Sequence, residues 1–313
     1  MAKKGFKILD SDIHIMEPAD LWDRYLDEPY KGRVKGLYDF TLDMRIEIDG
    51  KVVPTVLGTD ERLATKEMTL TEDVYKRFRE GGWTSKLQLE AMDQEGVDIA
   101  VIYPSRGLCG VAIEGMDPNL ANAIARAYNN WLYDFCQEDP SRLLAAGMIS
   151  PFDIEEAASE TKRCARELGF KAVFLRPNLV GGRNWYDTYY EPLWATIEEQ
   201  GISLGFHESQ GPLLPQVGSR FGSNAMLRHT VTHPFEQALA LMAFCGGGIL
   251  ERHPDLRVGF LEGNCSWVPF VLWRLDEHWE RLGGVYAPEL KMAPSEYFKR
   301  QCFVSIECDE EPA

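Results

Sequence analysis

A short stretch near the N-terminus concentrates residue types that bind divalent metals. An apolar run leads into Asp10, Asp12 and His14, and Glu17 follows three residues later. Because successive side chains of a β-strand point to opposite faces, Asp10, Asp12 and His14 would share one face of a strand. Asp12 and His14 then offer a carboxylate oxygen and an imidazole nitrogen, a pair suited to zinc or manganese. The competing interpretation is a solvated strand end that leads into a helix capped by Asp20.

Further polar side chains come directly after later apolar runs. They are Arg176, His207 with Glu208, Glu262, and Glu307 with Asp309. If those runs are parallel strands, the polar residues gather at one end of a sheet, where they are costly unless they hydrogen-bond or bind a ligand. We therefore predict a functional site there. Glu262 is the predicted general acid or base, and Arg176 would either clamp a substrate carboxylate or pair with Glu208 or Glu262.

The histidines differ in what their positions indicate. His14 and His207 each end a predicted strand directly, which is the stronger signal for a site. His229 and His233 are one helical turn apart and would be able to chelate a metal, although no H-E-x-x-H glutamate accompanies them. His233 would alternatively point into the pocket as a substrate-binding or acid–base group.

Helical segments and short apolar runs alternate along most of the chain, with glycine or proline between them. After the first strand, strands are predicted at 99–103, 143–149, 172–175, 203–206, 258–261 and 303–306, and helices at 19–30, 85–95, 120–136, 155–168, 191–199, 237–250 and 268–282. This α/β alternation is typical of a parallel sheet with right-handed crossovers. Without a dinucleotide-binding glycine motif, seven strands favour a (β/α)8 TIM-barrel type.

The predicted barrel departs from a regular one in two places. Residues 34–83 form an insertion after the first strand, in which 44–53 alternate and turn at Asp49-Gly50 as a β-hairpin does. Residues 60–83 of the insertion are either a lid or a surface excursion. An eighth strand is missing before Ala313. We expect residues 1–313 to be a fragment of a single barrel domain, the alternative being a barrel that is open or completed by another chain.

Composition excludes several classes of partner. The net charge of −16 over 313 residues argues against nucleic acid. No apolar run approaches the roughly 20 residues that cross a membrane, and no signal-peptide core follows the first methionine, so we expect a cytoplasmic protein without a membrane partner. The seven cysteines are scattered and lack C-x-x-C spacing, which indicates reduced thiols. We also expect a small-molecule substrate and a homo-oligomer, with a dimer favoured.

Several motifs together resemble the amidohydrolase-related family, in the branch of aminocarboxymuconate-semialdehyde decarboxylase and the aromatic acid decarboxylases. They are Asp10-Ser11-Asp12-Ile13-His14 with Glu17-Pro18, Phe206-His207, His233-Pro234-Phe235-Glu236, and residues 248–258 followed by Phe260-Leu261-Glu262. The resemblance runs from about residue 6 to the end and implies a metal-dependent (β/α)8 barrel. It places Asp12, His14 and His207 around one divalent ion, most often zinc or manganese.

The sequence departs from that family in three respects. Asp12 stands where the muconate-semialdehyde enzyme has histidine, and Glu262 stands where it has a histidine used in acid–base chemistry. The family's metal-binding Asp of strand 8, within an Asp-Tyr-Pro stretch, has no counterpart here. The leading hypothesis is therefore a metal-dependent hydrolase or C–C lyase (decarboxylase) acting on a small carboxylated, aromatic-derived compound. The alternative is a truncated or degenerate barrel without catalysis that serves in binding or assembly.

Overall fold

The computed structural model describes residues 5–37, 43–53, 75–111, 113–209, 215–307 and 310–312. The chain divides into two compact units, Met1–Met148 with Gly211–Leu213, and Ile149–Gln210 with Leu214–Ala313. Its main sheet has seven strands in the order β1-β5-β6-β7-β8-β9-β10, and a second sheet has the order β2-β3-β4. The predicted α/β class with a seven-stranded sheet is confirmed. The single barrel domain over 1–313 stays a prediction.

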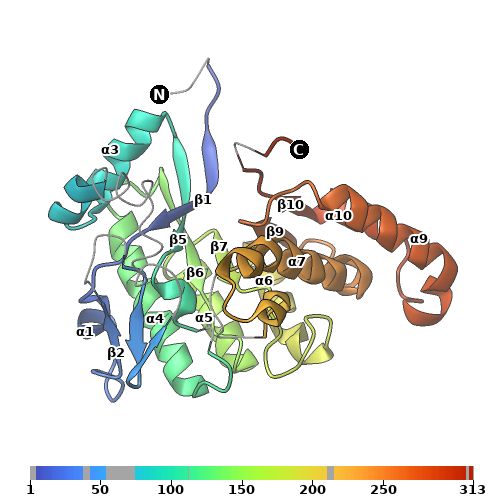
Figure 1. Cartoon of the computed structure of the whole chain (residues 1–313), viewed down its shortest axis with the longest axis horizontal. Coiled ribbons are helices and arrows are strands. Elements are labelled where there is room, and N and C mark those ends of the chain that lie inside the picture. Colours follow the sequence, from blue (N-terminus) through green and yellow to red (C-terminus); the bar gives the residue numbers. More distant parts are fainter. Residues whose placement is uncertain are drawn as a thin grey trace. The chain divides into compact units, whose positions relative to one another are not determined.

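The first unit contributes three parallel strands, which are β1 (Leu9–Ile15), β5 (Ile99–Pro104) and β6 (Leu143–Met148). β1 lies beside β5 (Figure 1), with a register shift between Asp10 and Ile13. Helices of this unit include α1 (Leu21–Tyr25), α3 (Ser85–Glu95) and α4 (Pro118–Cys136), and residues 75–80 are also helical. Helix α4 packs on β6, and the side chain of its buried Asn129 bonds both the N–H and the carbonyl of Met148, at 2.7 and 2.8 Å.

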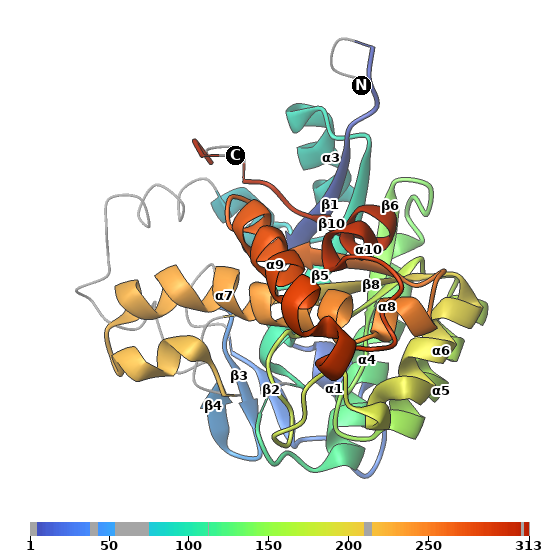
Figure 2. The same ribbon diagram turned by 90° about the vertical axis from the view of Figure 1, so that its right-hand side faces the viewer.

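Two sequence predictions for this unit have definite outcomes. The helix predicted over 19–30 is wrong in length, because α1 covers only Leu21–Tyr25, and the Asp20 side chain makes no capping hydrogen bond. The hairpin is confirmed within the small antiparallel sheet of β2 (Val34–Gly36), β3 (Ile46–Ile48) and β4 (Lys51–Val53) (Figure 2). Its turn residues Asp49 and Gly50 have φ of 49° and 76°, as a tight hairpin turn requires. The predicted lid, 60–83, lies outside the described residues as far as 74, and its described part is helical over 75–80.

The second unit contributes four parallel strands, which are β7 (Ala172–Leu175), β8 (Ser203–His207), β9 (Arg257–Leu261) and β10 (Cys302–Val304). Helices α5 (Ile154–Arg166) and α6 (Glu191–Gln200) lie side by side in Figures 1 and 2. The remaining helices are α7 (Ala225–Gly246), α8 (Ile249–Arg252), α9 (Val268–Tyr286) and α10 (Pro294–Gln301). Asp153 caps α5 by accepting hydrogen bonds from Glu155 N and Glu156 N, as a good N-cap does.

The helix predicted over 237–250 is wrong at both ends. α7 begins twelve residues earlier, at Ala225, and continues through Pro234. It ends at Gly246, because Gly248 has φ of 80° and starts the separate helix α8. His229 and His233 therefore both lie on α7.

An aromatic cluster in the second unit fixes the strand that carries His207. The Phe206 ring lies 5.3 Å from that of Phe244, 5.5 Å from that of Trp185 and 6.0 Å from that of Phe260, with which it is stacked. Phe206 is fully buried. The packing of Phe206 leaves little freedom to the backbone that positions His207.

Among the helices that the structure describes, none has the length and apolar character needed to cross a membrane.

Candidate metal centre

Asp12 and His14 lie near the C-terminal end of β1, as predicted. The His14 Nδ1 atom lies 2.7 Å from the carbonyl oxygen of Pro104, at the end of the neighbouring β5. Because a carbonyl only accepts, Nδ1 carries the hydrogen, and the lone pair of the neutral ring is on Nε2. That Nε2 lies 3.9 Å from Asp12 Oδ1. Asp10 does not share this role, since its Oδ1 accepts a hydrogen bond from Asp12 N at 3.0 Å.

His207 ends β8 and is fully buried. Its Nδ1 atom lies 2.7 Å from the carbonyl oxygen of Glu208, so Nδ1 carries a hydrogen and the ring nitrogen left to face the site is Nε2. That atom lies 3.1 Å from Glu262 Oε2. The Glu262 side chain follows β9 and is 44% exposed, so it is both next to the imidazole and open to solvent. Its backbone has φ of 47°, and its N–H donates to Ser305 Oγ at 2.9 Å.

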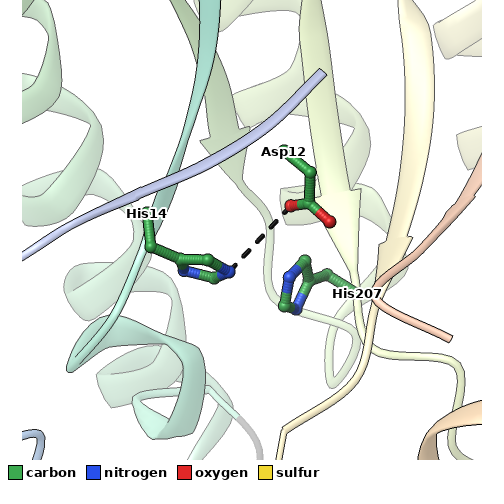
Figure 3. A group of neighbouring side chains, drawn as sticks. All are labelled: Asp12, His14 and His207. Carbon is green, nitrogen blue, oxygen red and sulfur yellow. Dashed lines mark ion pairs between the residues drawn. The ribbon is translucent and has the colours of Figure 1, made fainter. Parts of the chain in front are cut away.

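Asp12, His14 and His207 each offer one ligand atom, and these atoms all lie within 4.8 Å of one another (Figure 3). A carboxylate oxygen with two imidazole nitrogens is a donor set that suits zinc or manganese. Each imidazole has its Nδ1 bonded to a backbone carbonyl, which is the usual second interaction of a metal-binding histidine. The residues present therefore fit a divalent ion.

Arg176 follows β7 and contacts the carboxylate of Glu208, which matches one of the two interpretations of this arginine. Its Nη2 atom donates to Glu208 Oε1 and, at 2.9 Å, to the carbonyl oxygen of Ser209. Asn178 Nδ2 and Gln216 Nε2 also donate to the Glu208 carboxylate, at 2.6 and 3.2 Å. Arg176 Nε and Nη1 are buried without a hydrogen-bond partner among the described residues. These two nitrogens remain available to donate to a ligand, and the role of Arg176 as a clamp on a substrate carboxylate stays a prediction.

His233 and Glu236 lie one turn apart on α7, and both are buried. Burial lowers the pKa of His233 to about 3, and the nearby His229, His207 and Arg176 act in the same direction. His233 is therefore a neutral imidazole near pH 7, able to accept a hydrogen bond. Glu236 accepts a hydrogen bond from Val217 N at 2.6 Å, and burial together with the Glu208 charge raises its pKa to about 7.

Sequence reasoning missed several members of this polar network, namely Asn178, Gln216 and Glu236 acting on Val217. Asn178 had a local signal, because it stands two residues after Arg176, beyond the end of a strand. Glu236 stands in the motif His233-Pro234-Phe235-Glu236, but nothing in the sequence indicates that it accepts from Val217 N, or that Gln216 donates to Glu208. Glu307 and Asp309 are the polar residues predicted after the seventh strand. Glu307 is described, whereas Asp309 lies outside the described residues.

Comparison with known proteins places this arrangement in a family. A family model described as amidohydrolase matches residues 10–309. The chain belongs to the amidohydrolase family. The resemblance predicted from the motifs is thereby confirmed.

Two curated relatives of this amidohydrolase are decarboxylases. The 2-amino-3-carboxymuconate-6-semialdehyde decarboxylase of Dictyostelium discoideum is 24% identical over 78% of this chain and 66% of its own length. The gamma-resorcylate decarboxylase of Polaromonas sp. strain JS666 is 24% identical over 70% of this chain and 67% of its own. The chain thus matches about two thirds of the length of these enzymes.

Solved structures show the same fold as this amidohydrolase. An amidohydrolase from Mycobacterium avium subsp. paratuberculosis has a TM-score of 0.77 at 21% identity, covering 98% of this chain and 85% of its own. A dihydroxybenzoic acid decarboxylase from Polaromonas sp. JS666, with bound manganese and 2-nitroresorcinol, has a TM-score of 0.62 at 17% identity, covering 97% and 79%.

Proposed function

We propose that this amidohydrolase is a metal-dependent carboxy-lyase that removes CO2 from a small, aromatic-derived carboxylate. The observation that carries the proposal is the grouping of Asp12, His14 and His207, whose ligand atoms lie within 4.8 Å of one another. Curated relatives that are decarboxylases, and a similar structure with bound manganese, support it. They favour an enzyme over a barrel that serves only in binding or assembly.

Each polar residue has a distinct part in this proposal. Asp12, His14 and His207 hold the ion, which when bound supplies positive charge that polarises substrate oxygens. The unpartnered Nε and Nη1 donors of Arg176 contact a substrate oxygen. As the bond between the ring carbon and the carboxylate breaks, its electron pair stays on the carbon and CO2 leaves. Glu262 delivers the proton that the carbon then takes up.

His233 contributes as a neutral group in this scheme. Its lowered pKa excludes an imidazolium donor near pH 7, so we assign it a hydrogen bond to the substrate through its buried Nδ1. Hydrolysis is the second candidate reaction at the same centre. It is favoured by Glu262, because a partly exposed carboxylate 3.1 Å from a ligand imidazole is also placed to take a proton from water.

Metal content and product analysis test the proposal together. We expect about one zinc or manganese ion per chain, lost in His207→Asn and kept in His278→Asn, because His278 lies on α9 with its Nδ1 3.0 Å from the Arg274 carbonyl oxygen. The metal-loaded protein should release CO2 from 2,6-dihydroxybenzoate or 5-carboxyvanillate and leave ester and lactone substrates intact. Ester or lactone hydrolysis without CO2 release would select the second candidate. An absence of metal would contradict both.

Three further points belong to the same proposal. We propose that the seven-stranded sheet is part of a (β/α)8 barrel, which the likeness to the solved amidohydrolase supports. We propose a homodimer, because Phe270 and Trp273 of α9 are 63% and 59% exposed. We propose a cytoplasmic location, consistent with free cysteines among the described residues. Light scattering on the purified chain tests the dimer, since a monomeric mass would contradict it.

A further inference from the structure

A buried carboxylate holds the loop that follows β5. Glu17 is only 1% exposed, and its Oε1 accepts a hydrogen bond from Gly107 N at 2.9 Å. Its Oε2 accepts from Arg106 N at 2.9 Å and from Ser105 N at 3.3 Å. One side chain thus satisfies three consecutive backbone N–H groups. Three hydrogen bonds to one buried carboxyl group strongly fix the backbone that donates them.

The space around this loop leaves no room for a different arrangement. A Cβ atom on Gly107 would lie 2.9 Å from Glu17 Oε1 and 3.0 Å from both Met148 Cε and Pro104 Cβ. The carboxylate reaches the loop because residue 107 has no side chain. Arg106 adds further ties, since it donates to the carbonyl oxygen of Glu17 and, through Nε, to that of Asp43 at 2.6 Å.

The loop held by Glu17 starts at the residue that orients His14. Pro104 directly precedes Ser105, and its carbonyl oxygen lies 2.7 Å from His14 Nδ1. That carbonyl decides which ring nitrogen carries the hydrogen. A carbonyl displaced by more than about half an ångström would lengthen this 2.7 Å bond beyond its favourable range. The Nε2 lone pair would then no longer be fixed toward Asp12.

We propose that Glu17 is a positioning residue of the candidate metal centre, which acts by anchoring residues 105–107 so that the Pro104 carbonyl holds His14 with its lone pair on Nε2. The action runs through the backbone, because none of the contacts described for Glu17 is with the ring. The effect on metal binding rests on the proposed function. The effect on the His14 ring does not.

The test compares two variants that loosen the loop with one matched control. Glu17→Gln replaces an acceptor oxygen by an NH2 group that faces backbone donors. Gly107→Ala keeps Glu17 itself unchanged, but the added methyl group, 2.9 Å from Glu17 Oε1, pushes the carboxyl group away from the loop. Glu160→Gln is the control, because Glu160 is likewise buried but contacts Arg163 on α5. Metal-free protein at pH 8 is studied by nitrogen-15 NMR of the imidazoles, with the His14 signals identified by their loss in His14→Asn.

The expected result is a single His14 form with hydrogen on Nδ1 in the wild type and in Glu160→Gln. Both loop variants should show a mixture of the two ring forms. By calorimetry, their affinity for Mn²⁺ should fall by about 10-fold to 100-fold, as it does when outer partners of metal ligands are removed.

Each outcome has a definite meaning. A wild-type His14 with hydrogen on Nε2 would overturn the proposal before any variant is made, and so would folded variants whose His14 form and Mn²⁺ affinity are unchanged. If the ring form shifts in the variants but even the wild type binds no Mn²⁺, Glu17 positions His14 as stated and the proposed function fails instead.

Discussion

At the scale of single residues, burial shifts the pKa values of two neighbouring side chains of α7 in opposite directions. Burial opposes the charged form of each, so the imidazole of His233 has a lowered pKa and the carboxyl of Glu236 a raised one. Both groups are therefore neutral over a range in which they would be charged in water. Perturbed pKa values of this kind cluster at functional sites, and that of Glu236 lies near physiological pH.

Glu236 makes stability depend on pH in a predictable direction. In the folded chain Glu236 keeps its proton up to about pH 7, whereas an unperturbed glutamic acid has a pKa of 4.5. The stability that this raised pKa contributes is therefore fully present below pH 4.5 and is lost as the pH rises to 7. Glu236→Gln is neutral throughout. It should therefore raise the free energy of unfolding at pH 8 by up to about 3 kcal/mol and change it little at pH 4.5. Urea unfolding at both pH values measures this, and an equal change at both would indicate a packing effect instead.

The candidate metal ligands were predictable because their signal is local. Asp12 and His14 lie in the second half of β1 and His207 is the last residue of β8, and their ligand atoms lie within 4.8 Å of one another. From the sequence, Arg176 would either clamp a substrate carboxylate or pair with Glu208 or Glu262. The structure shows the pair with Glu208, which the sequence does not distinguish from one with Glu262. The role of Glu17 was not visible, because its partners stand about 90 residues away and are backbone groups that carry no sequence signal.

At the scale of elements, one glycine lets a short helix rest on α7. The 3-10 helix η4 (Val217–Phe221) packs against α7, where a Cβ on Gly218 would lie 2.2 Å from Thr232 Oγ1 and 2.8 Å from the Arg228 carbonyl oxygen. The contact brings Val217 N to Glu236. The hydrogen bond from Val217 N to Glu236 thus depends on the close approach of η4 to α7 that Gly218 permits.

Gly218→Ala should destabilise the chain because the added methyl group meets backbone that cannot retreat. We expect a loss of about 1–3 kcal/mol in the free energy of unfolding. Gly284→Ala is the control. Its Cβ meets nothing within 4 Å in helix α9, so the exchange should stabilise by up to about 1 kcal/mol. Denaturant unfolding of both variants compares them, and a loss of equal size in both would contradict the steric explanation.

Strands were easier to predict than helix ends. The runs at 99–103, 172–175, 203–206 and 258–261 are strands within a residue or two, because continuous apolar runs between glycines have few other solutions. α7 was misplaced because a proline usually marks a boundary, whereas Pro234 lies inside this helix. Packing against η4 and the bond from Val217 to Glu236 outweigh the missing N–H.

At the scale of the whole molecule, a bound ion should stabilise the folded chain by mass action. A ligand that binds only the folded state at 100 times its Kd adds about 2.7 kcal/mol. Mn²⁺ or Zn²⁺ should therefore raise the unfolding temperature of the wild type by several degrees in calorimetry. His207→Asn should show no such rise. A rise of the same size in that variant would place the ion elsewhere, for example on the strongly acidic surface implied by the net charge of −16.

The pairing of β1 with β5 also has a consequence for the order in which the molecule is made. Leu9 pairs with Ile99 and His14 with Tyr103, so the first strand finds its neighbour about 90 residues later. At about 5–20 residues per second, the ribosome needs roughly 5–20 s to supply that neighbour. Until then, Asp12 and His14 have neither the strand nor the Pro104 carbonyl that orients them. Asp12 and His14 thus leave the ribosome roughly 5–20 s before the residues that orient them.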